Sequence, residues 1–118
     1  MTYVQGFVIP VPEGNRDAYI ELAKASWPAF KRLGALSTFE GWGDDIKRGE
    51  TTDFYRAVKA EDGEAVVFSW VVWPDRETCE NAAADMPNQP EFQNPPEEVP
   101  FAGKRMFWGG FTPIFEGD

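Results

Sequence analysis

The segment 63–74, G-E-A-V-V-F-S-W-V-V-W-P, constrains the fold of this chain more than any other. Its β-branched and aromatic residues are typical of a strand. Successive side chains of a strand point to opposite faces, and Ser69 is the one polar residue between positions 65 and 73. Both faces of this strand are therefore apolar, and each needs a covering layer. Residues 3–11 and 106–115 are predicted to be strands of the same kind.

Two helices are predicted around these strands. The first follows Asn15, a capping residue, and ends at Gly34, which can adopt the left-handed conformation that stops a helix. Its apolar stripe at helical spacing consists of Tyr19, Leu22, Ala23, Ser26, Phe30 and Leu33. The second helix, residues 76–86, is capped by Asp75. Its predicted inward side chains are Cys79, Ala82, Ala83 and Met86.

Two further strands are predicted, which completes the element order. These are residues 35–43 and residues 53–60, and a hairpin turn at 61–64 joins the second of them to the central strand. The order predicts one α+β domain over residues 1–118, a ferredoxin-like βαββαβ fold with one extra strand. Two helices cover only one face of the antiparallel sheet. We therefore expect the other face to pack against a second copy, giving a homodimer that forms a dimeric α/β barrel.

The composition excludes several classes of function. The chain has 20 acidic and 11 basic residues and a net charge of −9, so it repels phosphate backbones and is not expected to bind nucleic acid. No apolar run approaches the ~20 residues that span a membrane. Histidine is absent, which removes histidine bases, Ser-His-Asp triads and most zinc or haem sites, so no cofactor and no metal are predicted. A single cysteine, Cys79, favours the cytoplasm.

Polar residues beside tryptophans form the best candidate site. Glu40 is the candidate catalytic base, because desolvation beside an aromatic ring raises the pKa of a carboxyl. Lys104 and Arg105 could hold the carboxylate or enolate of a substrate. The predicted ligand-binding residues are Trp42, Arg56, Ser69, Trp70, Lys104, Arg105 and Trp108.

Each of these features also has a purely structural interpretation. Glu40 could pair with Arg56 or Lys104 across strands and take no part in chemistry. The five tryptophans could fill the core or a dimer interface instead of lining a cavity. Residues 87–100 contain five of the ten prolines and form a long connection, which could act as a lid or pocket wall or could simply pack across a neighbour.

Several segments resemble the YbaA-like family of small bacterial proteins of unknown function. They are Y-V-Q-G-F-V-I-P-V-P, F-K-R-L-G-A-L, E-G-W, D-F-Y-R-A-V-K-A, V-V-F-S-W and P-F-A-G-K-R-M-F-W-G-G-F, which together span nearly the whole chain. The resemblance implies a dimeric α/β barrel related to antibiotic-biosynthesis monooxygenases, muconolactone isomerases and stress-responsive barrel proteins. It implies no established activity and no catalytic residues. The chain differs from the family mainly at residues 44–52 and 87–100.

Three functions are compatible with these observations. The first is a protein that binds a small apolar or aromatic molecule between the sheet and the helices. The second is a cofactor-free enzyme, monooxygenase- or isomerase-like, in which Glu40 moves a proton and Lys104 and Arg105 hold an anion. The third is a protein-interaction module without catalysis, acting through the connection 87–100. We favour the first.

Overall fold

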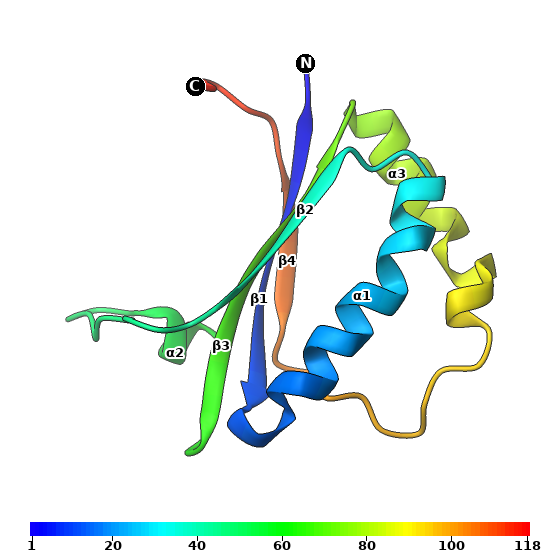
Figure 1. The fold of residues 1–118 in the computed structure, drawn as a ribbon. Coiled ribbons are helices and arrows are strands. Elements are labelled where there is room, and N and C mark those ends of the chain that lie inside the picture. Colours follow the sequence, from blue (N-terminus) through cyan, green and yellow to red (C-terminus); the bar gives the residue numbers. More distant parts are fainter.

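The structure, a computed structural model, describes residues 1–118 and contains one antiparallel sheet with two main helices (Figure 1). In chain order its elements are β1 (Tyr3–Pro12), α1 (Arg16–Arg32), β2 (Ser37–Trp42), α2 (Phe54–Ala57), β3 (Glu64–Trp73), α3 (Arg76–Asp85) and β4 (Phe107–Phe111). Short 3-10 turns occupy Glu13–Asn15, Met86–Asn88 and Pro90–Phe92. The predicted elements are therefore present, with one exception described below.

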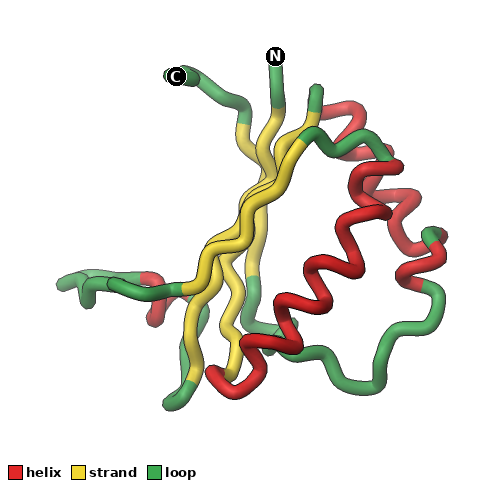
Figure 2. The backbone as a smooth tube through the Cα atoms, viewed as in Figure 1, coloured by secondary structure: helices red, strands yellow, loops and turns green.

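The four strands lie in the order β2-β3-β1-β4, and every neighbouring pair is antiparallel. β3 and β1 form the centre of the sheet, with Gly6 opposite Trp70. The helical crossovers α1 and α3 follow β1 and β3, and both cover the same face (Figure 2). This order and these crossovers define the ferredoxin-like plan, which confirms the predicted fold class.

The face of β3 that points toward the helices forms most of the core. Val71 and Trp73 form a buried cluster with Cys79 and Ala82 of α3. A second cluster joins Val67 of β3 and Ile9 and Val11 of β1 to Tyr19 of α1. Because alternate residues of β3 share a face, the apolar residues predicted on this face all meet the helical layer.

The opposite face of the sheet is covered only at one end. There, Val8, Val58 and Val66 form a third buried cluster beneath the segment that carries α2. Phe68 is 44% exposed farther along β3, and its neighbour Trp70 stacks on Phe39 with ring centroids 4.3 Å apart. We call this uncovered surface the open face; its apolar residues are Val4, Phe39, Phe68, Trp70, Phe107 and Phe111.

The prediction of a strand at residues 53–60 is wrong, because these residues contain the short helix α2. The Asp53 side chain accepts a hydrogen bond from the backbone N–H of Arg56 at 2.8 Å and so caps a helical turn. An aspartate at this position offers the backbone an alternative to a strand ladder, which the alternating sequence pattern did not reveal. The turn at 61–64 is present, with Gly63 at φ +81°, but it joins α2 to β3.

The predicted helix caps are confirmed in α3 and differ in α1. Asp75 accepts a hydrogen bond from the backbone N–H of Thr78 at 2.7 Å. The Asn15 side chain does not cap α1; it donates instead to the carbonyl oxygen of Pro100 at 3.3 Å. Ala83 is exposed, and its predicted inward position is therefore wrong. The face of α3 that contacts the sheet is narrower than predicted, with Cys79 and Ala82 as its buried residues. No helix combines the length and the apolar character that crossing a membrane requires.

We expect Gly34→Ala to destabilise the fold by about 1–3 kcal/mol, since a non-glycine residue is strained at positive φ. Gly34 ends α1 with φ +109°, and an added Cβ would lie 2.7 Å from Cγ2 of Thr78. Gly14→Ala is the matched control, because nothing lies within 4 Å of its added Cβ. Urea unfolding of both variants measures the difference, and equal midpoints for the two would contradict this account.

Candidate ligand-binding site

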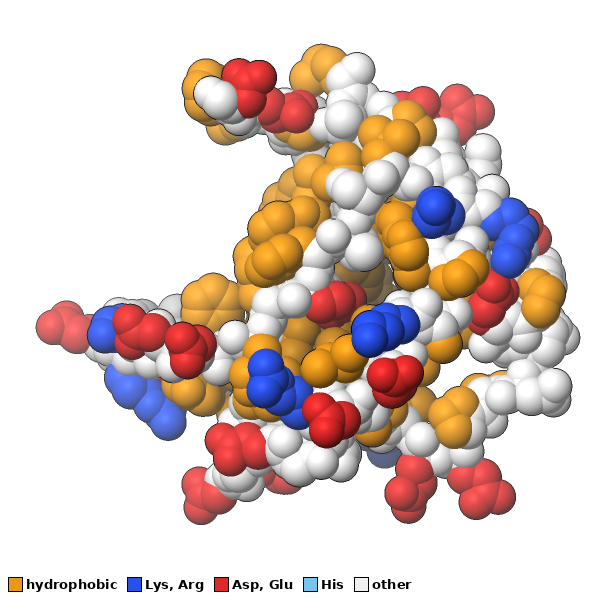
Figure 3. Space-filling view, in the orientation of Figure 1, with side chains coloured by type: hydrophobic (Ala, Val, Ile, Leu, Met, Phe, Trp, Pro, Cys, Tyr) orange, Lys and Arg blue, Asp and Glu red, His pale blue; other side chains and the backbone are white.

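A cavity of about 440 Å³ lies between the sheet and α1. Figure 3 shows the hollow with hydrophobic side chains around it and an acidic side chain at its opening. Its aromatic walls are Phe7, Tyr19, Trp27, Phe30, Phe92 and Phe101. The cavity remains open because the stripe of α1 carries two small side chains, Ala23 and Ser26, opposite the sheet.

Three polar groups share one side of this cavity. The Tyr19 hydroxyl donates a hydrogen bond to Oε1 of Glu40 at 2.7 Å. Ser69, only 2% exposed, lies directly opposite Glu40 in the β2–β3 ladder, so both side chains leave the same face of the sheet. On this side, the cavity therefore combines apolar walls with one carboxylate and two hydroxyl groups.

The surroundings of Glu40 and Tyr19 shift both of their pKa values upward. Glu40 is an exposed residue of β2 at the opening of the cavity, yet the apolar side chains around its carboxyl partly desolvate that group. This burial raises the pKa of Glu40, and the hydrogen bond from Tyr19 only partly opposes the effect. Burial, followed by the charge of Glu40, raises the pKa of the Tyr19 phenol, which therefore stays protonated and can donate.

The charges on the cavity walls are all acidic. Glu40 and Glu91 are the charged residues among the lining side chains, and no lysine or arginine lines the cavity. Glu91 is neutralised by Arg32, whose Nη2 lies 3.0 Å from its Oε2. Glu40 has no such partner, because the hydrogen bond that it accepts comes from the neutral phenol of Tyr19.

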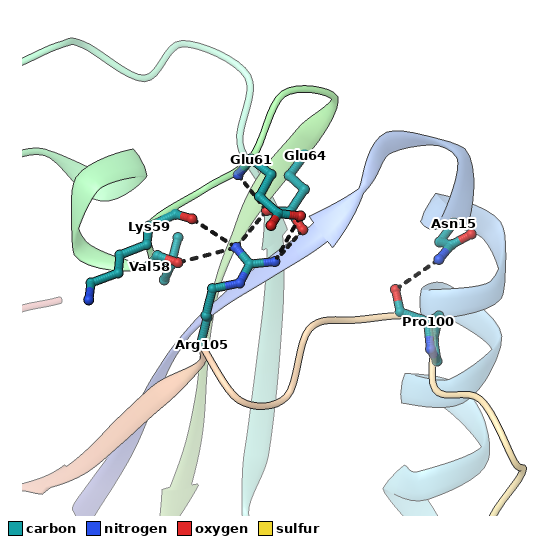
Figure 4. Close-up of polar contacts among 7 residues, drawn as sticks. All are labelled: Asn15, Val58, Lys59, Glu61, Glu64, Pro100 and Arg105. Carbon is teal, nitrogen blue, oxygen red and sulfur yellow. Dashed lines mark hydrogen bonds and ion pairs between the residues drawn. The ribbon is translucent and has the colours of Figure 1, made fainter.

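The connection 87–100 forms the outer wall of the cavity through Phe92, Pro95, Pro96 and Val99. Polar contacts hold it at both ends. Near its start, Arg32 of α1 binds Glu91; at its far end, the Asn15 side chain donates to the carbonyl of Pro100 (Figure 4). Of the two interpretations offered by the sequence, the structure therefore gives this connection a place in the pocket wall.

Two of the predicted site residues, Glu40 and Ser69, line the cavity together. Trp42 follows Glu40 on the same face of β2, and the Arg16 guanidinium carbon lies 5.6 Å from the centre of its ring. Trp70 belongs to the open face, on the other side of the sheet. Trp108 pairs with Phe7 across β1 and β4 and is 62% exposed, away from Glu40.

The predicted basic residues do not join Glu40. Arg56 lies in α2, where its Nε is 3.6 Å from Oδ2 of the capping residue Asp53. Lys104 is exposed in the loop before β4. Arg105 binds Glu64 with both terminal nitrogens, at 2.7 and 2.6 Å, and donates to the carbonyl of Lys59 at 2.9 Å (Figure 4). The expected grouping of these bases with Glu40 is therefore wrong, because none of them lines the cavity. Arg105 lies instead beside the segment that follows α2, at the carbonyl groups of Val58 and Lys59.

Comparison with known proteins places this chain in a family. The family model described as a protein of unknown function, DUF1428, matches residues 2–103. The chain belongs to this family. It is 46% identical over 116 residues to the uncharacterized protein YbaA of Escherichia coli K12, and equally to that of Shigella flexneri, covering 98% of this chain and 99% of each relative.

Two solved structures are similar at lower levels of identity. One is SnoaB, a cofactor-independent oxygenase from Streptomyces nogalater, with 16% identity and a TM-score of 0.45, covering 98% of this chain and 93% of that chain. The other is the de novo designed protein Foldit4, with 15% identity and a TM-score of 0.47, covering 96% of this chain and 99% of that chain.

The cavity of this DUF1428 family member includes residues that the sequence analysis assigned to the core. Tyr19, Ala23, Ser26 and Phe30 were expected to pack against the sheet as an apolar stripe, yet they line a hollow. The sequence signal that could have revealed the cavity is the pair of small residues, Ala23 and Ser26, in the middle of the stripe. Trp27 was not singled out, although it lies at helical spacing from Ala23 and Phe30 and lines the same cavity.

The Arg105–Glu64 pair leads to a prediction about acid stability. The pKa of Glu64 lies below its ordinary value of 4.5, mainly because Arg105 donates hydrogen bonds to its carboxylate. A carboxyl whose pKa is lower in the folded state stabilises that state above its unfolded pKa and loses this effect as the pH falls through the folded value. We therefore expect Glu64→Gln to lower the melting temperature at pH 7, and the difference from wild type to shrink toward about pH 3.

Thermal melts at several pH values between these limits would measure this difference. Glu80→Gln is a suitable control, since Glu80 is exposed and pairs only with Arg76 on its own helix. A Glu64→Gln defect that stayed constant at every pH would show that packing, and not the charge of Glu64, stabilises this end of the sheet.

Proposed function

We propose that this protein binds a small apolar molecule in the cavity between the sheet and α1. The observation that carries the proposal is the cavity itself, about 440 Å³ in volume with mainly apolar walls and three polar groups on one side. Sites for small molecules are usually concave, apolar and about 300–1,000 Å³ in volume, with a few polar groups that orient the ligand. A ligand with one or two rings and a single polar end fits this description.

The proposal includes a homodimer formed through the open face. Its support is that four large aromatic side chains, Phe39, Phe68, Phe107 and Phe111, are each more than two-fifths exposed there. Apolar patches of this kind on a protein surface usually mark an interaction site. A second copy offers the same patch, so a twofold axis would bury both at once. A cytoplasmic location is also part of the proposal and rests on the single cysteine.

A native mass spectrum of the protein purified from its own host tests both parts. We expect twice the chain mass of 13.3 kDa, with additional mass from a retained ligand that is lost on denaturation. A neutral dye such as Nile red should then bind to ligand-free protein and gain fluorescence. A bare protein that also fails to bind the dye would contradict the binding function, and a clean monomer would contradict the dimer.

A second candidate function is a cofactor-free enzyme that uses Glu40 as a base. The observation in its favour is the raised pKa of Glu40 beside a protonated phenol, an arrangement in which one group can accept a proton and another can donate a hydrogen bond. Tyr19 and Ser69, and not Lys104 and Arg105, would then stabilise the anion that forms on the substrate.

We expect Glu40→Gln to fold normally and to abolish any such turnover, because an amide accepts the Tyr19 hydrogen bond but cannot take up a proton. Its melting temperature should stay within a few degrees of wild type, since neutral glutamine relieves the desolvation of a charged group. Circular dichroism and thermal melts measure this result. A Glu40→Gln chain that does not fold would assign Glu40 a structural role.

A further inference from the structure

The cavity walls point to the charge of the ligand. We propose that this site binds a lipophilic amine, an inference that rests on the binding function proposed above. Such a ligand has an aromatic or apolar body and one positively charged nitrogen, which lies against Glu40. The inference depends on the charge of the walls, on the free acceptor capacity of Glu40 and on the aromatic rings around it.

Only a cation would meet a complementary charge in this cavity. No basic side chain lines it, and the second acidic residue, Glu91, is already paired with Arg32 at 3.0 Å. Glu40 accepts a hydrogen bond only from the neutral Tyr19 hydroxyl. A carboxylate can accept about four hydrogen bonds, so an ammonium group would find unused acceptors at Glu40.

Partial desolvation of the Glu40 carboxyl also favours a positively charged ligand. Apolar side chains around Glu40 remove part of its hydration, and no protein cation compensates for this loss. A positively charged ligand would supply the missing partner, and the attraction between the two charges is stronger in a cavity of low dielectric constant than in water. A neutral ligand would gain only apolar contact, and a carboxylate ligand would be repelled.

The aromatic side chains of the cavity wall also favour a positively charged ligand. Tyr19 and Phe101 meet edge to face with ring centroids 6.2 Å apart, and Trp27 and Phe30 belong to the same walls. The faces of aromatic rings attract cations, and aromatic side chains beside a carboxylate are a common way to bind alkylammonium groups. The net charge of −9 acts in the same direction at longer range, because it raises the local concentration of cations.

Three probes with the same aromatic body test this inference: naphthylethylamine, naphthylethanol and naphthylacetate. Isothermal titration of the whole protein at neutral pH and low salt compares their affinities. We expect the amine to bind at least about tenfold more tightly than the alcohol, because a desolvated charge pair adds to the shared apolar contact. The acetate should bind more weakly than the alcohol.

Two variants distinguish the effect of the Glu40 carboxylate on amine binding from the effect of the net charge of the protein. Glu40→Gln should reduce amine affinity by about tenfold or more and change alcohol affinity by less than about threefold. Glu21→Gln removes the same charge from an exposed position of α1 and should leave both affinities unchanged. If Glu40→Gln does not fold, titration of wild type at a pH above the pKa of the amine tests whether the charge of the ligand causes the preference, which should then disappear.

The outcomes distinguish this inference from the function on which it rests. Equal affinity for amine and alcohol, tighter binding of the acetate, or an amine preference that survives in Glu40→Gln would overturn the inference and leave the binding function in place. If none of the three probes binds the wild-type protein, both the inference and the binding function fail.

Discussion

Replacing Phe68 with aspartate is expected to convert the proposed homodimer into a monomer. Phe68 lies near the middle of the open face, where its ring meets Trp70 and Phe54 edge to face with centroids 5.7 and 6.0 Å apart. In the dimer, the aspartate would be a carboxylate buried without a partner, which costs several kcal/mol. We therefore expect the dissociation constant of the dimer to rise by at least about 100-fold.

Size-exclusion chromatography with light scattering measures the mass of each variant at micromolar concentration. Ile20→Asp is the matched control, because Ile20 is also a partly exposed apolar residue but lies on α1, away from the open face. It should remain dimeric. Far-UV circular dichroism confirms that both variants fold. A folded Phe68→Asp protein that remained dimeric would show that the interface, if one forms, lies elsewhere on the molecule.

Filling the cavity is expected to abolish ligand binding without unfolding the protein. Ala23 lines the cavity from the inner side of α1. A tryptophan at this position would place an indole ring in a space of about 440 Å³ and would obstruct the part of it next to α1, where the ligand is proposed to bind. We expect Ala23→Trp to weaken Nile red or amine binding by more than about 30-fold, with stability close to wild type because the ring fills empty space.

Ala25→Trp provides the control for this variant. It introduces the same side chain two residues away on the exposed side of α1, so it adds the same fluorescence and the same surface apolarity. Binding to Ala25→Trp should equal binding to wild type. If Ala23→Trp kept full affinity, the dye or ligand would be bound elsewhere, and the uncovered aromatic residues of the open face would be the next place to test.

The regular elements of this fold were predictable because their signals are local. The apolar residues of β3 alternate with a period of two, and the stripe of α1 recurs at helical spacing, so strand, helix and inward faces follow from short stretches of sequence. The failure at residues 53–60 was also local. Alternating residues suggested a strand, but the capping hydrogen bond from the Arg56 N–H to Asp53 stabilises a helical turn instead.

The candidate site was predicted only in part, because its members are distant in the sequence. Glu40 was recognised as a carboxyl on the same strand face as Trp42, and Ser69 as the polar residue of an apolar strand; both are local features. Their neighbour Tyr19 comes from α1, and nothing in the sequence indicated that its hydroxyl reaches Glu40. Arg105 was assigned to the site for its charge, yet the fold pairs it with Glu64, 41 positions earlier in the chain.

The sequence by itself determined the four strands and two main helices that the structure contains, their order and the apolar character of both sheet faces, because these depend on periodicity and on short-range hydrogen bonds. It also predicted a strand at residues 53–60 that does not form. Only the tertiary structure decided that a cavity remains between the sheet and α1 at Ala23 and Ser26. It also decided that the connection 87–100 forms the outer wall of that cavity, and that Glu40 lines it without a basic partner. These features depend on distances between separate elements, which packing of the whole chain sets.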